Sequence, residues 1–145
     1  MIKQMEYQSE RKMELLHFDK YKGYTYYILN LGTHPTAYIE IPKGHKLYKQ
    51  DYNDIYKMGY DIDVHGGLTY SSNGLMMIKS ENWFIGWDYA HVGDYMGYYK
   101  NFNDWNIRTI NSICDDKKWT TEEIIEECKN AIKQIIEIEK GSIVN

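Results

Sequence analysis

The chain has 145 residues and a formal net charge of −4, with 43% hydrophobic and 26% charged residues. These values are typical of one ordinary globular domain, so we predict a single domain over residues 1–145. Arginine occurs only at Arg11 and Arg108. A nucleic-acid polymer is therefore not expected as a partner, because phosphate backbones are bound by clustered basic side chains.

The sequence contains no stretch of roughly 18 apolar residues that would span a membrane. Its polar start, Met1 to Glu6, does not resemble a secretory signal. The two cysteines, Cys114 and Cys128, match no zinc or thioredoxin spacing, as expected for a reducing cytosol. We therefore expect a cytoplasmic protein with no membrane partner. Its 15 tyrosines favour either half-buried strands or an aromatic-lined binding surface.

The first elements in chain order suggest a hairpin. Residues 1–20 are charged and mixed, and fit a frayed end, a short helix or an edge strand. Residues 24–31 and 37–41 are rich in aromatic and β-branched types, which predicts two strands. The short connection at 32–36 predicts that these two strands pair in an antiparallel hairpin.

The middle of the chain predicts further short elements separated by polar turns. In order, they are a helix at 50–58, a strand at 61–65 that continues toward Tyr70, a turn at 71–74, a strand at 75–79, a turn at 79–82 and a strand at 83–88. Residues 93–103 are expected to form a loop. Residues 104–116 fit either a loop or a short helix.

The last element is an amphipathic helix. Five apolar residues fall on one helical face: Ile124, Cys128, Ala131, Ile132 and Ile135. Thr120 and Glu123 have the spacing of a capping box, and Gly141 supplies a stop. The apolar face must cover one face of a sheet. The predicted class is therefore α+β, an antiparallel sheet packed against a C-terminal helix.

The first polar motif runs from Asp61 to Tyr70. Residues two apart on a strand share a face, so Asp63 and His65 would point the same way. The glycines Gly66 and Gly67 would leave backbone amides open near that face. The pattern fits either a solvent-facing strand or a polar binding site.

The second polar motif runs from Trp83 to Asp94. Asp88, His91 and Asp94 follow one another at a spacing of three, which places them on one side of a helical turn. Carboxylate and imidazole groups are common ligands of zinc, manganese or iron, and they also act as a general base and its orienting partner. The alternative is that Asp88 caps a turn and His91 packs under an aromatic ring.

The aromatic residues of this second motif also allow two interpretations. Trp83, Trp87 and Tyr89 alternate along a predicted strand and so share a face. That pattern favours packing on the sheet. The alternative is a platform on which a nucleobase would stack.

If the two strands pair, the polar residues of both motifs converge on one small site, with the loop residue His45 at its rim. The expected ligand-binding residues are His45, Asp63, His65, Gly66, Gly67, Thr69, Trp87, Asp88, His91 and Asp94. In an enzyme, His65, Asp88 and His91 would be catalytic. If a divalent metal is the cofactor, Asp88, His91 and Asp94 would be its ligands.

The order of these motifs resembles a widespread family of small phage-encoded proteins of uncharacterised function. The resemblance spans about residues 24–140 and rests on four segments: Gly44 to Tyr48, Val64 to Tyr70, Trp83 to Asp94 and Trp119 to Glu122. This chain departs from the family in extra length at 55–60 and in Tyr89, where cysteine is frequent. The resemblance implies a viral, cytosolic accessory protein and supplies no activity.

A small phage protein with a polar site and many aromatic residues suggests counter-defence. The first hypothesis is a protein that binds a small nucleotide-derived host signalling molecule, with aromatic faces stacked on the base. The second is a hydrolase of such a nucleotide, using divalent metals or a metal-free acid–base pair. The third is a protein-binding inhibitor of a host defence enzyme. The tyrosine content also leaves open a homodimer with a shared pocket.

Overall fold

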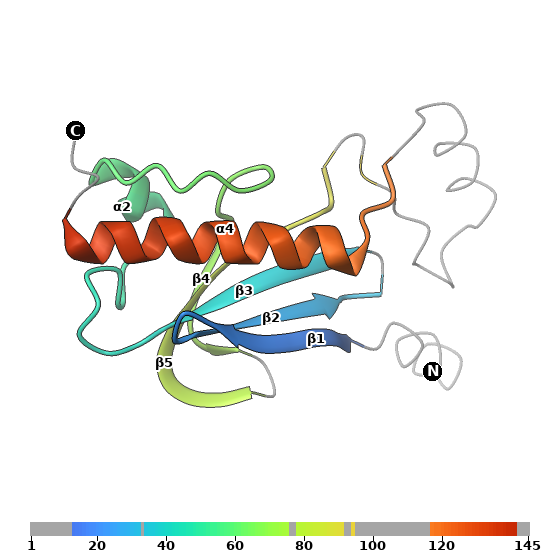
Figure 1. Cartoon of the computed structure of the whole chain (residues 1–145), viewed down its shortest axis with the longest axis horizontal. Coiled ribbons are helices and arrows are strands. Elements are labelled where there is room, and N and C mark those ends of the chain that lie inside the picture. Colours follow the sequence, from blue (N-terminus) through green and yellow to red (C-terminus); the bar gives the residue numbers. More distant parts are fainter. Residues whose placement is uncertain (1–12, 33, 76–77, 92–93, 95–116, 142–145) are drawn as a thin grey trace, which may run out of the picture.

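The computed structural model describes residues 13–32, 34–75, 78–91, 94 and 117–141. Within these ranges the chain forms five strands and two helices (Figure 1). They are β1 (Glu14–Tyr21), β2 (Tyr24–Asn30), β3 (Pro35–Ile41), α2 (Tyr52–Lys57), β4 (Tyr70–Leu75), β5 (Ile78–Asp88) and α4 (Thr121–Lys140). Apart from Asp94, the elements predicted at 93–103 and 104–116, and Cys114, lie outside the described residues.

The five strands form one antiparallel sheet in the order β1-β2-β3-β5-β4. The predicted hairpin is confirmed, since β2 pairs with β3 and places Ile28 opposite Ala37. The N-terminal part of the described chain forms the edge strand β1. With α4 packed on the sheet, the predicted α+β class is confirmed.

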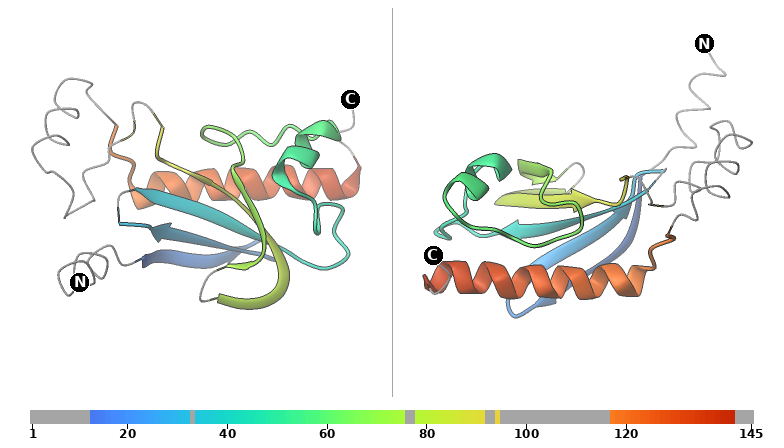
Figure 2. Two further views of the ribbon diagram at one scale, coloured as in Figure 1. Left: turned by 180° about the vertical axis from the view of Figure 1, so that it is seen from behind. Right: turned by 90° about the horizontal axis from the view of Figure 1, so that it is seen from above.

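Helix α4 covers one face of the sheet, as the view from above shows (Figure 2). All five apolar residues predicted for its inner face are buried, from Ile124 to Ile135. They pack against strand residues such as Ile39 and Ile85 in the larger of two buried clusters. Cys128 belongs to this core, and burial raises the pKa of its thiol. The opposite face has a smaller cluster centred on Tyr38 and Phe84.

The two ends of α4 have the predicted signals. The Thr120 side chain accepts a hydrogen bond from the Glu123 backbone, and the Glu123 side chain accepts one from the Thr120 backbone. Gly141 ends the helix in the left-handed conformation, with φ 75°. Among the residues that the structure describes, no helix is long and apolar enough to cross a membrane.

The prediction of a strand at 61–65 is wrong. Ile62 and Val64 are buried and alternate with exposed residues, but the backbone pairs with side chains of α4 instead of a strand. The Asp63 amide donates to Oε1 of Gln134 over 2.7 Å, and Nε2 of Gln134 donates to the Asp63 carbonyl over 3.0 Å. Alternation alone does not distinguish a paired strand from an extended loop packed on a helix.

Two predicted turns are also wrong. Residues 71–74 belong to β4, where Gly74 has a φ of 84° next to the register shift between Asn73 and Leu75. Residues 79–82 belong to β5, so the predicted strand 75–79 is divided between the end of β4 and the start of β5. The polar residues Ser80 and Asn82 do not form a turn. Both side chains donate hydrogen bonds to the Glu40 carboxylate on β3. The predicted helix at 50–58 and strand at 83–88 are confirmed as α2 and as part of β5.

Candidate functional site

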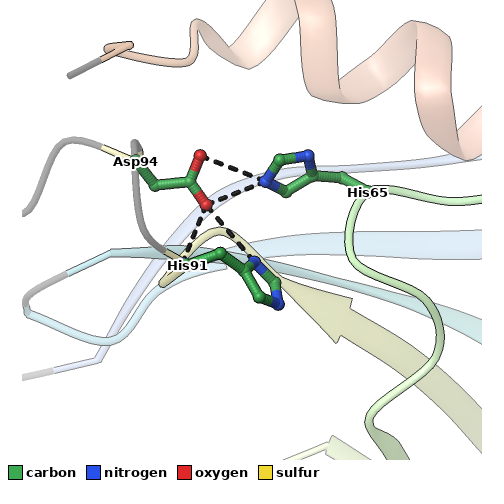
Figure 3. Close-up of side chains that lie close together, drawn as sticks. All are labelled: His65, His91 and Asp94. Carbon is green, nitrogen blue, oxygen red and sulfur yellow. Dashed lines mark hydrogen bonds and ion pairs between the residues drawn. The ribbon is translucent and has the colours of Figure 1, made fainter. Parts of the chain in front are cut away.

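Three polar side chains from the two sequence motifs meet beyond the end of β5. His65 lies in the connection between α2 and β4, whereas His91 and Asp94 follow β5 (Figure 3). Nε2 of His65 lies 2.8 Å from Oδ2 of Asp94, and Nδ1 of His91 lies 3.3 Å from the same oxygen. We call these three residues the His–Asp cluster. The predicted convergence of the two motifs therefore holds for these residues.

Asp94 is the anchor of the His–Asp cluster. It is only 5% exposed, and its carboxylate accepts hydrogen bonds from Nε1 of Trp119 over 2.9 Å and from the His91 amide over 3.0 Å. Burial acts to raise the pKa of Asp94, but the hydrogen bonds from His91, His65 and Trp119 outweigh it and lower the pKa. The group is therefore a buried carboxylate held in its charged form.

Aromatic rings fix the orientation of His65. Its imidazole is stacked on the Tyr89 ring, with centroids 5.0 Å apart and an interplanar angle of 6°. The Trp119 ring lies on another side with its centroid at 4.8 Å, and the His91 ring meets His65 edge-on at 5.1 Å. A ring enclosed in this way has little freedom to turn away from Asp94.

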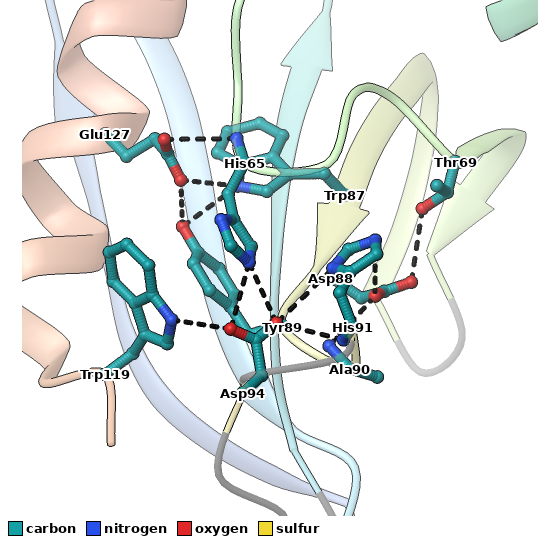
Figure 4. A network of polar contacts seen from close by, with 10 residues as sticks. All are labelled: His65, Thr69, Trp87, Asp88, Tyr89, Ala90, His91, Asp94, Trp119 and Glu127. Carbon is teal, nitrogen blue, oxygen red and sulfur yellow. Dashed lines mark hydrogen bonds and ion pairs between the residues drawn. The ribbon is translucent and has the colours of Figure 1, made fainter. Parts of the chain in front are cut away.

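Glu127 of α4 connects the helix to the sheet and to the His65 loop (Figure 4). It accepts hydrogen bonds from Nε1 of Trp87 over 3.2 Å, from the Tyr89 hydroxyl and from the His65 amide over 3.1 Å. Burial and the hydrogen bond to Glu127 raise the pKa of Tyr89. Trp87, 1% exposed, therefore belongs to the core beneath the site, as expected for the packing interpretation of the aromatic motif.

Glu127 and Trp119 were not among the predicted site residues. Glu127 directly precedes Cys128, so it lies at the border of the buried face of α4, where a carboxylate is unusual. Trp119 precedes the N-cap, and in sequence its position fits a packing residue that fixes the start of the helix. A carboxylate at the edge of an apolar stripe was the one signal that could have indicated Glu127.

Asp88 borders the His–Asp cluster without joining it. Its Oδ1 lies 3.8 Å from Nε2 of His91 and accepts a hydrogen bond from the Ala90 amide over 3.1 Å. Its Oδ2 accepts a hydrogen bond from the Thr69 hydroxyl over 3.3 Å. The hydrogen bond from the Ala90 amide is the local turn that the sequence offered as the alternative role for Asp88.

The predicted metal ligands change in one position. Among the described residues, the group whose ligand atoms could hold a metal ion is His65, His91 and Asp94, with those atoms all within 4.8 Å of one another. His65 therefore replaces Asp88 in the predicted set. The helical spacing of three suggested Asp88, but none of the described residues 89–91 and 94 is helical, and Asp88 accepts hydrogen bonds from Ala90 and Thr69.

Gly66 is required by local packing, whereas Gly67 is favoured by its backbone conformation, with a φ of +80°. A Cβ added to Gly66 would lie 2.4 Å from two atoms of the His91 ring, and its φ is +70°. The sequence predicted open backbone amides here, but the group that lies against Gly66 is the ring of His91. The Gly67 amide donates to the Val64 carbonyl over 2.9 Å, so it is used within the loop.

Two predicted site residues, His45 and Asp63, contact α4 away from the His–Asp cluster. His45 is 6% exposed; its Nδ1 accepts from the Leu47 amide over 3.0 Å, and its Nε2 donates to the Ile135 carbonyl over 3.2 Å. Burial lowers the pKa of His45, as expected for a structural histidine. Asp63 is exposed beside Gln134. These contacts lie about 10–12 Å farther along α4 than Glu127, at a rise of 1.5 Å per residue.

A small hollow lies on the sheet face opposite α4, next to Asp88. Its volume is about 210 Å³, and its lining residues are Leu31, His34, Thr36, Tyr38, Thr69, Tyr70, Trp87 and Asp88. The Tyr38 and Tyr70 rings meet edge to face in it, with centroids 5.0 Å apart. Typical ligand pockets have roughly 300–1,000 Å³, so this hollow fits one ring of a larger ligand.

Comparisons of this chain with protein-family models, with curated proteins and with solved structures found no match. The fold and site together define a small α+β protein with two adjacent features at one end of its sheet. One is the His–Asp cluster beyond β5, and the other is the aromatic hollow. Asp88 connects them, because it lines the hollow and lies 3.8 Å from His91.

Proposed function

We propose that this chain is a phage accessory protein that binds a small nucleotide-derived host signalling molecule in the host cytoplasm. One observation carries the proposal: an aromatic hollow and a pair of imidazoles adjoin each other at Asp88. Ligand sites of this kind combine apolar walls with a few convergent polar groups. A ligand that spans both features would have one flat ring and one strongly polar part.

The hollow supplies contacts for the ring. Tyr38 and Tyr70 offer aromatic faces and edges, and a nucleobase stacks well on such surfaces. The Asp88 carboxylate at its border accepts hydrogen bonds, so it suits the exocyclic amine of a base or the hydroxyls of a sugar. The polar part of the ligand would then extend toward His91.

A second candidate function is hydrolysis of the same ligand. The observation in its favour is the His65–Asp94 pair, in which a buried carboxylate orients an imidazole at 2.8 Å. This is the arrangement of a general base and its orienting partner. The side chain of His65 is 25% exposed, so a reacting group could reach it.

The experiment that tests binding uses the small-molecule extract of phage-infected cells. The purified chain is incubated with this extract, washed and denatured, and the released compounds are identified by mass spectrometry. We expect a nucleotide-derived compound from the wild-type protein, and less of it from the Tyr70→Ala and His91→Ala variants. An intact compound indicates binding, and its cleavage product indicates hydrolysis.

The control is His17→Ala. His17 lies on β1, three strands away from β5 and so about 14 Å across the sheet, where its ring contacts the Tyr26 hydroxyl. We expect His17→Ala to retain as much compound as the wild type. Retention that does not depend on Tyr70 or His91, or no retained compound at all, would contradict the proposal.

A further inference from the structure

We infer that His65, His91 and Asp94 form a binding site for one divalent transition-metal ion. This inference goes beyond the ligand proposal and stands without it, because it depends on the His–Asp cluster alone. Two imidazoles and one carboxylate are a common ligand set for zinc, and for iron or manganese in related sites.

The distances suit a metal ion. In a tetrahedral site with bonds of about 2.0–2.2 Å, ligand atoms are separated by about 3.3–3.6 Å. In the cluster, Oδ2 of Asp94 lies 2.8 Å from Nε2 of His65 and 3.3 Å from Nδ1 of His91. All three ligand atoms lie within 4.8 Å of one another. Small rotations of the rings would bring the three atoms to equal distances from one ion.

The charge of the cluster also favours a cation. Asp94 is buried, and a buried carboxylate is normally paired with a positive charge or bound to a metal. A second carboxylate, Asp88, lies 3.8 Å from Nε2 of His91. A divalent ion would balance both and would also provide a partner for an anionic group of the ligand.

The surrounding contacts are those that orient metal ligands. Nδ1 of His91 points to Asp94, while its Nε2 lies 3.8 Å from Oδ1 of Asp88. A metal-binding histidine commonly donates its second ring nitrogen to a carboxylate, and a small shift of the Asp88 side chain would bring it within hydrogen-bond distance of His91. The Asp94 carboxylate is itself fixed by Trp119, as described above. In this arrangement Asp88 is a positioning residue for His91.

The site also has room for a further ligand of the metal. The side chains of His65 and His91 are 25% and 36% exposed, so solvent reaches both imidazoles of the cluster. Three protein ligands with one accessible position are typical of zinc sites that act on a substrate, whereas purely structural sites have four protein ligands. The partly exposed His91 side chain lies 3.8 Å from Asp88, which lines the hollow.

The test is a calorimetric titration of the full-length, EDTA-treated and dialysed protein with ZnCl2, together with elemental analysis of protein purified without chelator. We expect one Zn²⁺ per chain. His91→Ala and His65→Ala should each weaken Zn²⁺ binding at least about 100-fold. Asp88→Asn should weaken it about 10–100-fold, as is usual for groups that orient a ligand.

The control is again His17→Ala, which should bind Zn²⁺ as the wild type does, and far-UV circular dichroism establishes that each variant is folded. No Zn²⁺ binding by the wild type would overturn the inference. So would equal affinity in His91→Ala and wild type, or binding of Mg²⁺ in preference to Zn²⁺, because imidazole ligands favour zinc. No nucleotide is present in this titration, so its outcome is separate from that of the extract experiment.

Discussion

Gly66 makes room for the His91 ring. Its left-handed φ of +70° turns the chain directly after His65, and its missing side chain leaves the space that the ring occupies. The His91 ring can therefore meet the His65 ring because the residue that follows His65 has no side chain. Pairs of glycine in a sequence indicate close backbone approach, but they do not indicate which group approaches.

Replacing Gly66 with alanine should disturb the cluster more than a glycine replacement elsewhere. Gly23→Ala is the matched control, because Gly23 also has a positive φ (+88°) but its added Cβ would meet nothing within 4 Å. Left-handed strain alone should lower the free energy of unfolding by about 1–2 kcal/mol in both variants. The clash with His91 should add to this loss in Gly66→Ala only. Urea unfolding and zinc titration measure the two effects; equal results for both variants would contradict this account.

At the scale of elements, helix α4 could be predicted because the signals that define it are local in sequence. Its apolar spacing, capping box and terminal glycine involve residues within one or two turns of each other. The strands were less predictable where their partners are distant in sequence. Ser80 and Asn82 were interpreted as turn residues, yet both donate to Glu40, about 40 residues away. The polarity of a short segment does not indicate that its side chains will pair with a carboxylate on the neighbouring strand.

The N-cap of α4 should contribute measurably to stability. Thr120→Ala removes the side chain that accepts from the Glu123 amide, so the free energy of unfolding should fall by about 1 kcal/mol. Thr121→Ala is the control, since this neighbour lies inside the first turn and should change stability by less than about 0.5 kcal/mol. Thermal or urea unfolding compares the two. A larger loss in Thr121→Ala would show that the cap is not the source.

For the molecule as a whole, Glu127 links three parts of the chain that are far apart in sequence. It belongs to α4, and its carboxylate accepts from Trp87 and Tyr89 at the end of β5 and from the His65 loop. The convergence of His65, His91 and Asp94 was predictable because both motifs contain unusual polar residues. Glu127 and Trp119 were not, because their roles depend on how α4 lies across the sheet.

Truncation of Glu127 should therefore destabilise the whole fold. Glu127→Ala removes the acceptor of the buried Tyr89 hydroxyl and of the His65 amide, and leaves the indole N–H of Trp87 with the Tyr89 hydroxyl alone. The free energy of unfolding should therefore fall by about 2–4 kcal/mol. Glu126→Ala is the matched control, because Glu126 is exposed and its ion pair within the described part of the chain is a 3.7 Å contact with Lys129. Urea unfolding should separate the two variants clearly; similar midpoints would exclude the linking role of Glu127.

The position of Trp119 has a practical consequence. Its indole ring lies 4.8 Å from the His65 ring, and its N–H donates directly to Asp94. A natural fluorophore is thus built into the wall of the cluster. Whatever occupies that place, whether ion, proton or small molecule, should alter the emission of this tryptophan, so that the protein reports its own occupancy without a dye or label.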